Sequence, residues 1–252
     1  MNTVLRYVLA GAILLAAGTA AAKKQEESST FGIAVDGSAL LGLGVSVGIP
    51  VGERFNLRAA YHGLTYELDD IKDDATGATY TSELDLSSAG VLLDIHPFKG
   101  AFRLTLGLAS NSNQINLSGI AGPGATYEVS DCTYESDPGN PLRIDGSVGF
   151  SGTAPYVGIG WGGNMNAAPG FFMTFDIGVL LSGAPETSLG GRGGVRAQPG
   201  QGGLCGDEAV YQDAATYQPF LDEVAEAEAD VDEETKDFEY WPNIALGFGW
   251  RF

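Results

Sequence analysis

The sequence is poor in histidine and cysteine, with two of each, and poor in positive charge. Lys and Arg together number 13 against 32 Asp and Glu, which gives a formal net charge of −19. This balance argues against nucleic acids and anionic membrane surfaces as partners. After residue 22 no stretch approaches the roughly 20 apolar residues of a membrane-spanning helix. A membrane role for the rest of the chain would therefore require a closed β-barrel, which also satisfies its backbone hydrogen bonds in lipid.

The few candidate catalytic groups do not form a recognisable active site. Thr65 and Glu67 are near His62, but in an alternating strand both lie on the face opposite His62, so they could not complete a triad with it. His96 stands beside a proline at an expected turn, and no serine lies in a nucleophile motif. The acidic residues at 69–74 lack the ligand spacing of a calcium loop. We therefore expect no enzyme, no cofactor and no metal site.

The N-terminus has the three-part layout of a secretory signal. Arg6 supplies the positive charge, residues 8–17 are almost wholly apolar, and residues 20–22 are the small side chains that signal peptidase requires. The apolar run is short for an anchor that must cross about 30 Å of hydrocarbon. We expect residues 1–22 to be a signal peptide and residues 23–252 to form one exported domain.

Several later segments alternate with a period of two residues, which is the signature of β-strands. In the final segment, bulky apolar side chains occupy the even positions from Ile244 to Phe252, and Asn, Ala, Gly and Arg occupy the odd ones. The same contrast recurs in residues 41–49, 102–111, 155–162 and 171–182. One face of each strand is therefore bulky and apolar, whereas the other carries mostly small residues and a few charges.

This contrast favours a membrane barrel over a soluble β-sandwich, which would turn its bulky side chains inward and its polar ones to water. Small residues on the second face suit the narrow interior of an eight-stranded barrel, and aromatic residues near strand ends suit the two interfacial girdles. The expected fold is all-β: an eight-stranded antiparallel transmembrane β-barrel, with an acidic helical insert before the last strand.

The connections predict how this barrel is oriented, because outer-membrane barrels place short turns in the periplasm and long loops outside. The expected strands are residues 55–68, 80–96, 102–117, 142–162, 171–183 and 240–252. The long connections between them are residues 69–78, 118–141 and 184–239. Splitting residues 31–50 at Asp36-Gly37-Ser38 gives the even count of eight. The apolar phase runs unbroken through this stretch and opposes a two-residue hairpin but not a three-residue loop, so a single strand stays the alternative.

The insert at residues 185–239 has two parts. Residues 185–216 are rich in Gly, Pro, Gln and Ala, which predicts a flexible loop. In residues 219–237, Phe220, Val224 and residues at matching helical spacing form a thin apolar stripe among many acidic side chains. Two placements of this helix are open: it rests on the barrel rim, or it caps or enters the barrel mouth.

Charged residues on the small-residue faces predict a polar network inside the barrel. Alternation turns inward Arg58, His62, Glu83, Asp85, Arg103, Asp176 and Arg251. Asp94 lies at the same level, although simple alternation turns it outward unless a bulge intervenes. An Arg–carboxylate network there would plug the barrel and fix its register, or line a narrow, gated path for small solutes.

Cys132 and Cys205 both fall in long connections on the expected outer side of the barrel. A cysteine pair in an exported chain predicts a disulfide, here one that ties two loops together.

The signal peptide, the glycine-and-aromatic strands and the terminal Trp250-Arg251-Phe252 resemble small outer-membrane barrels of the OmpA and OmpW type. More narrowly, a group of largely uncharacterised proteobacterial outer-membrane barrels is similar at Asp94-Ile95-His96-Pro97-Phe98, at residues 154–162, at Asp176-Ile177-Gly178-Val179 and at Gly183-Ala184-Pro185. The resemblance implies an outer-membrane location, and makes Trp250 and Phe252 a signal for the barrel-assembly machinery. It carries no catalytic residues.

The leading expectation is therefore a structural or narrow-channel outer-membrane protein that contacts lipid, lipopolysaccharide and small solutes. A surface binding or adhesion module that uses residues 118–141 and 185–216 is the second. A lipid-modifying enzyme is the third.

Overall fold

The computed structural model describes residues 29–73, 77–201, 203–206 and 209–252, and the predicted signal peptide lies outside them. These residues are mostly β-strand, with one α-helix among them, so the prediction of an all-β chain with a helical insert is confirmed. No helix in this part of the chain is both long and apolar enough to cross a membrane.

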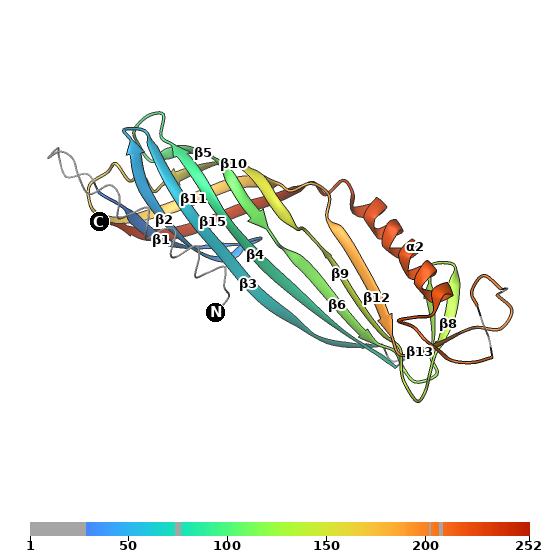
Figure 1. Ribbon diagram of the computed structural model, residues 1–252. Coiled ribbons are helices and arrows are strands. Elements are labelled where there is room, and N and C mark those ends of the chain that lie inside the picture. Colours follow the sequence, from blue (N-terminus) through green and yellow to red (C-terminus); the bar gives the residue numbers. More distant parts are fainter. Residues whose placement is uncertain (1–28, 74–76, 202, 207–208) are drawn as a thin grey trace.

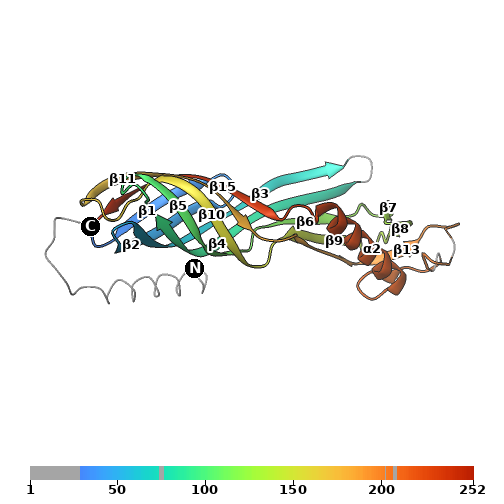
Figure 2. The same cartoon turned by 90° about the horizontal axis from the view of Figure 1, so that it is seen from above.

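Eight strands pair with one another in a closed ring (Figure 1; Figure 2). In ring order they are β1 (Gly32–Ser38), β2 (Gly42–Gly52), β3 (Phe55–Asp73), β4 (Ala78–Ile95), β5 (Phe102–Asn111), β10 (Gly152–Gly162), β11 (Gly170–Leu181) and β15 (Tyr240–Arg251). Every neighbouring pair is antiparallel. The pairings of β15 with β1 and of β4 with β5 close the ring, and closure removes the exposed sheet edges that would otherwise pair with other chains.

The first hairpin settles how residues 31–50 fold. β1 and β2 are joined by residues 39–41, and Val35 pairs directly with Val45. This three-residue loop keeps the apolar phase unchanged, and Gly42, with a φ of 82°, provides the left-handed residue that such loops use. The predicted split into two strands is correct. The turn consists of residues 39–41, however, and not of Asp36-Gly37-Ser38 as predicted.

Three more strands extend the sheet beyond the ring, so the main sheet has eleven strands and not the predicted eight. They are β6 (Gln114–Ile120), β9 (Arg143–Gly149) and β12 (Glu186–Arg192). β6 continues β5, β9 leads into β10, and β12 follows β11. The three strands pair in the order β4-β6-β9-β12, beside the half of β4 that extends away from the ring, which we call its outer half. We call these three strands, with the outer halves of β3 and β4, the sheet extension.

The predicted strands at 102–117 and 142–162 are each divided where the ring ends. β4 nevertheless pairs with β5 and β6 in one register, since Ser88 faces Asn111 and Asp85 faces Gln114. The divided strand therefore bends without turning over.

A second sheet of four strands lies at the far end of the extension (Figure 1). It contains β7 (Thr126–Val129), β8 (Cys132–Ser136), β13 (Gly194–Ala197) and β14 (Gln212–Asp213). The predicted long connection at 118–141 and the predicted flexible loop at 185–216 thus hold ordered strands. β7 and β8 form a hairpin, and β8 also pairs with β13, which is distant in the sequence.

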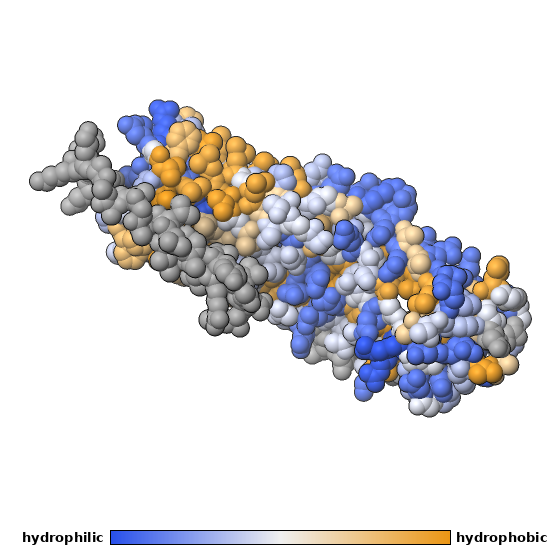
Figure 3. All heavy atoms as spheres, in the orientation of Figure 1, coloured by the Kyte–Doolittle hydropathy of each residue, from blue (hydrophilic) through white to orange (hydrophobic). Residues whose placement is uncertain are grey.

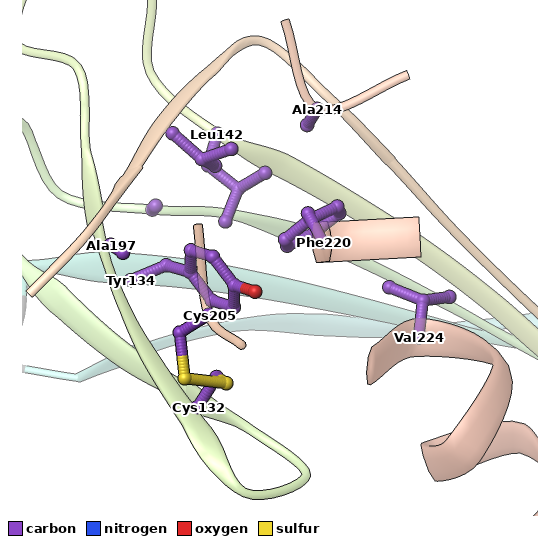
Figure 4. Packing of buried hydrophobic residues seen from close by; sticks show 10 residues of the cluster. Cys132, Tyr134, Leu142, Ala197, Cys205, Ala214, Phe220 and Val224 are labelled. Carbon is purple, nitrogen blue, oxygen red and sulfur yellow. A yellow bond between two sulfur atoms is a disulfide. The ribbon is translucent and has the colours of Figure 1, made fainter. Parts of the chain in front are cut away.

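A disulfide and a small apolar core hold this second sheet together (Figure 4). Cys132 and Cys205 are bonded as predicted and lie 73 positions apart in the sequence. In the chain-entropy model, closing a loop of this length stabilises the folded state by about 4 kcal/mol. Tyr134, Leu142 and Val195 are fully buried around the disulfide, so this core is separate from the interior of the ring.

The acidic insert forms α2 (Gln218–Thr235), close to the predicted helix at 219–237. Phe220 and Val224 are its buried residues, and both belong to the core around the disulfide. A Cβ at Gly191 of β12 would lie 2.5 Å from the ring of Phe220, so the helix packs closely on that strand. The helix therefore docks on β12 and the second sheet; it neither rests on the rim of the ring nor enters its mouth, and both predicted placements were wrong.

Two carboxylates of α2 cover the free edge of β12. Glu228 accepts a hydrogen bond from the backbone N–H of Leu189 at 2.5 Å, and Asp232 accepts one from the N–H of Thr187 at 3.0 Å. The two acids lie four residues apart on one helix face, and the two N–H groups lie two residues apart on one strand edge. Because an unpaired strand edge invites association with other chains, the acidic character of this helix has a structural use.

The sheet reverses its polarity where the ring ends. The outward side chains of the ring are bulky, apolar and exposed, and we call them the apolar band: Leu43, Val91, Leu104, Leu106, Leu108, Phe171, Met173, Leu246 and Phe248. Figure 3 shows apolar surface over the ring on the side that faces the viewer. On the extension the same face is polar and carries Thr65, Glu83, Asp85, Ser118 and Asp145. Apolar residues there occupy the face that continues the interior of the ring: Leu64, Tyr66, Ile115 and Leu117.

Replacing Glu228 and Asp232 with alanine should free the edge of β12. We expect the amide protons of Thr187 and Leu189 to exchange with solvent at least about tenfold faster, because a hydrogen bond to a charged acceptor contributes about 1.5–3 kcal/mol. Glu226→Ala with Asp230→Ala is the matched control, since both side chains are exposed on the same helix. Equal exchange in the two variants, measured by NMR or mass spectrometry, would contradict the edge-covering role.

Candidate functional site

Four charged side chains meet inside the ring, near the short turn at residues 96–101. Arg58 comes from β3, Asp94 from β4, Arg103 from β5 and Asp176 from β11. We call these residues the four-charge cluster. It connects strands on both sides of the ring interior.

The cluster contains two close ion pairs that also contact each other. Arg58 donates from Nε and Nη2 to the two oxygens of Asp94, at 2.8 and 3.0 Å. Arg103 donates from Nη2 to both oxygens of Asp176, at 2.7 Å each. Longer ion pairs of 3.6 Å join Arg58 to Asp176 and Arg103 to Asp94. Each arginine thus meets both carboxylates, and the formal charges of the four groups cancel.

The cluster is removed from solvent and supported by neutral groups. Arg103 is 1% exposed and Asp94 is 2% exposed. Thr105 donates to Asp94 at 2.7 Å, and Arg103 donates from Nη1 to the carbonyl oxygen of Gly162. A buried charge without its partner is strongly destabilising, so these groups stabilise the ring only as a set.

Buried apolar side chains lie inside the ring on both sides of the cluster. Leu41, Leu92, Tyr156 and Leu180 form a buried apolar layer on the side of the extension, with Trp241 packed against it. Cavities of about 30 Å³ and 20 Å³ lie on either side of the cluster. Each has room for one or two water molecules.

A further polar contact lies between the cluster and the apolar layer. His62 Nε2 is 2.7 Å from Asp36 Oδ2. Gly44 lies beside this pair, and a Cβ there would come within 2.3 Å of the imidazole. Sequence reasoning placed Asp36 in a turn and missed this contact. The sequence did contain a signal for this contact. Asp36 lies two residues after Ala34 on the same strand, so its side chain shares the inward face on which Ala34 is buried.

Two acids predicted to face inward lie elsewhere. Asp85 accepts a hydrogen bond from Thr65 at 3.3 Å, and Glu83 accepts one from Asn116 at 3.3 Å, both on the outward face of the extension. Asp94, which simple alternation turned outward, faces inward without a bulge in this part of β4. The predicted phase of β4 was therefore inverted, because its outward face changes from acidic on the extension to apolar on the ring.

Arg251 faces inward but lies apart from the four-charge cluster. Its Nε donates to the carbonyl oxygen of Ala168 at 2.9 Å, and its guanidinium lies 5.1 Å from the centre of the Phe172 ring. It therefore holds the chain near residue 168. Trp250 and Phe252, the predicted assembly signal, are both half exposed at the end of β15.

The second histidine holds a turn. His96 is fully buried, and its ring nitrogens lie 3.0 Å from Asn56 Nδ2 and 3.0 Å from the carbonyl oxygen of Gly100. Within the described residues no group of three or more His, Cys, Asp or Glu side chains is arranged to hold a metal ion.

Comparison with known proteins gives a fold and no family. No family model and no curated protein matches the sequence. Two crystal structures of CarO from Acinetobacter baumannii, an outer-membrane β-barrel protein, are similar to the chain. The CarO2 structure has a TM-score of 0.51 at 16% identity, and the match covers 91% of this chain and 100% of that chain. The other CarO structure has a TM-score of 0.49 with the same identity and coverage. At such low identity the likeness extends to the fold alone.

Arg103→Ala should lower the free energy of unfolding by about 3–5 kcal/mol, because it leaves Asp176 buried without its main partner. Adding Asp176→Asn should recover part of this loss, since a neutral amide needs no countercharge. Arg54→Ala is the control, because Arg54 is exposed at a turn. Urea titrations of the protein in phospholipid vesicles measure all three. A midpoint for Arg103→Ala equal to that of Arg54→Ala would show that the cluster does not stabilise the ring.

Proposed function

We propose that this protein is an outer-membrane β-barrel in which the ring spans the bilayer as an eight-stranded barrel with a sealed lumen. The observation that carries the proposal is the distribution of polarity. Exposed apolar side chains cover the outside of the ring, whereas a four-charge cluster fills its inside. This arrangement is unfavourable in water and suits hydrocarbon, where only closed strands and helices satisfy the backbone.

Strand lengths support the proposal. β5 has 10 residues and β11 has 12, and a tilted transmembrane strand needs about 9–11. The fold shared with CarO and the predicted signal peptide also favour an outer-membrane location. We orient the barrel with its short turns in the periplasm, and with the sheet extension and its disulfide outside. Trp250 and Phe252 then serve as the signal for the barrel-assembly machinery, and lipid and lipopolysaccharide contact the apolar band.

The proposed role is structural, with a lumen plugged by charge and by the apolar layer. For small solutes to pass, both the four-charge cluster and the apolar layer would have to move aside. We propose no catalytic activity, because His62 contacts Asp36 inside the ring, whereas Thr65 lies on the outward face with Asp85. The sheet extension is a folded unit outside the proposed membrane region, and it is the part of the chain suited to binding a partner.

Membrane residence predicts that the purified mature chain needs detergent or lipid. We expect unboiled and boiled samples to migrate differently on gels, because the closed ring resists unfolding by detergent at room temperature. Circular dichroism of the unboiled form should show β-structure. A chain that stays monodisperse in plain buffer would overturn the proposed location, since its apolar band would then be stable in water.

Sealing of the lumen predicts no steady conductance in planar bilayers. Combining Arg103→Ala, Asp176→Ala and Leu180→Ala removes one ion pair and part of the apolar layer, and should produce small open events. Leu104→Ala with Leu106→Ala is the control, because both residues face outward. Large, steady steps from the unmodified protein would show that the lumen is open.

A further inference from the structure

The connection between β10 and β11 closes one mouth of the ring. It consists of residues 163–169, which we call the lid turn, and it lies at the same end of the ring as the turn at residues 96–101. Met165 of the lid turn is 4% exposed and packs inside the ring against Phe172. A Cβ at Gly32 of β1 would lie 2.5 Å from its sulfur atom, so the fit is close. The cavity of about 20 Å³ is lined by Met165 and by all four members of the four-charge cluster, which places the lid turn directly beside the cluster.

One buried amide, that of Asn56 at the start of β3, bonds to the lid turn through both of its ends. Asn56 is 1% exposed, and its Nδ2 donates to the carbonyl oxygen of Gly163 at 3.3 Å. Its Oδ1 accepts a hydrogen bond from Asn166 Nδ2 at 3.3 Å, and the same Nδ2 donates to the carbonyl oxygen of Gly52 at 2.9 Å. Further hydrogen bonds of the lid turn involve Ser29, Asn164 and Arg251.

The same amide fixes the protonation state of His96, which follows β4 in the turn at residues 96–101. His96 Nε2 lies 3.0 Å from Asn56 Nδ2. The contacts with Gly163 and Asn166 determine which end of the Asn56 amide is the nitrogen, so Nδ2 donates and His96 Nε2 accepts. His96 Nδ1 lies 3.0 Å from the carbonyl oxygen of Gly100 and therefore carries the proton. The hydrogen bonds thus select one neutral tautomer of the imidazole.

A second proton on His96 is incompatible with this arrangement. It would turn Nε2 into a donor that points at another donor, Asn56 Nδ2. The Asn56 amide can accept a hydrogen bond from the charged ring only by turning over. Its oxygen would then point at the carbonyl oxygen of Gly163, and its nitrogen at the NH₂ group of Asn166. Both contacts with the lid turn would change from attractive to repulsive.

We propose that the lid turn is released by acid: protonation of His96 turns over the Asn56 amide, loosens residues 163–169 and opens the mouth of the ring as far as Met165. Loss of two neutral hydrogen bonds raises the population of the open form roughly tenfold. The four-charge cluster and the apolar layer still seal the lumen behind the lid turn, so this opening is separate from conduction. Only the assignment of the lid turn to the periplasmic side rests on the proposed function.

The surroundings of His96 keep it neutral at neutral pH. Burial lowers the pKa of His96 and the charge of Arg103 lowers it further, against the hydrogen bond to Gly100 and the charge of Asp94, which raise it. The lid bonds are therefore complete above the ordinary histidine pKa of about 6.5, and they are lost as the pH falls through the lowered pKa of His96. The charged residues of the surrounding elements are Asp94, Arg103, the Lys99–Glu53 ion pair, and Arg54, whose carbonyl oxygen accepts from the His96 N–H. The lid turn contains no charged residue.

Met165 itself reports the opening, because hydrogen peroxide oxidises an accessible methionine to the sulfoxide. A thioether has no proton to lose, so its own reactivity does not change with pH. Met173 is the other methionine after the predicted signal peptide, and it is 58% exposed on the outward face of the ring, which makes it the internal reference. In the folded protein in detergent, the ratio of Met165 to Met173 oxidation should rise roughly tenfold from about pH 8 to about pH 4.5, with a midpoint below the ordinary histidine value. Peptide mass spectrometry measures both sites.

Three variants test the relay. His96→Gln keeps a neutral donor and acceptor without a titrating ring, and should hold the oxidation ratio low across the pH range. His62→Gln, the same change at the other histidine, should retain the rise in acid. Asn56→Ala removes the contact with both Gly163 and Asn166, and should leave the ratio high at every pH. Different migration of boiled and unboiled samples confirms that each variant has folded.

An oxidation ratio that is independent of pH in the native protein would overturn the proposal, as would a rise in acid that survives in His96→Gln. If His96→Gln does not fold, His62→Gln decides, because loss of the rise in that variant would assign the titration to the wrong histidine. None of these outcomes depends on the membrane location. A chain that is monodisperse without detergent would refute the location, and its lid turn would be tested in the same way in plain buffer.

Discussion

A ring of strands that turns its bulky side chains outward must satisfy every charge in its interior without help from water. Arg103 shows this constraint most directly, because it is 1% exposed. Its charge is balanced by both oxygens of Asp176 and, at longer range, by Asp94. These partners come from strands on either side of the interior, so the arginine is tolerated only when the ring is closed and in register. Closure of the ring and neutralisation of the cluster therefore depend on each other.

The inward glycines follow from the same constraint. A Cβ at Gly160 would lie 3.0 Å from both Arg103 Nε and Asp176 Oδ1, and a Cβ at Gly178 would lie 2.1 Å from the hydroxyl oxygen of Tyr156. Large inward side chains fit only because their neighbours on the adjacent strands have no side chain. At these positions glycine supplies space within a packed interior, which is a different role from the flexibility it gives to loops.

Sequence reasoning predicted the strands well where one face keeps the same surroundings along its whole length, as in β11 and β15. It failed on β4 because Glu83 and Val91 share a face that meets water on the extension and forms part of the apolar band on the ring. Period-two analysis assumes one environment for each face, and here the environment changes partway along the strand. It also missed β12 and β13, since residues 186–197 are rich in glycine and lack an apolar period. Those strands are specified by partners distant in sequence, and a local pattern does not reveal them.

The change of environment requires the strands to leave the curvature of the ring without losing their register. At the junction of β5 and β6, the N–H of Ser112 donates to the carbonyl of Ser87, and the N–H of Ser87 donates to the side chain of Asn113. A side-chain amide thus replaces a backbone acceptor at the point where the ladder is interrupted. Because Asn113 Oδ1 points to the strand to accept this hydrogen bond, the NH₂ group of the same side chain lies on the other side, among apolar residues. Within the described residues Asn113 Nδ2 is buried without a hydrogen-bond partner, and this follows directly from how the sheet passes from the ring to the extension.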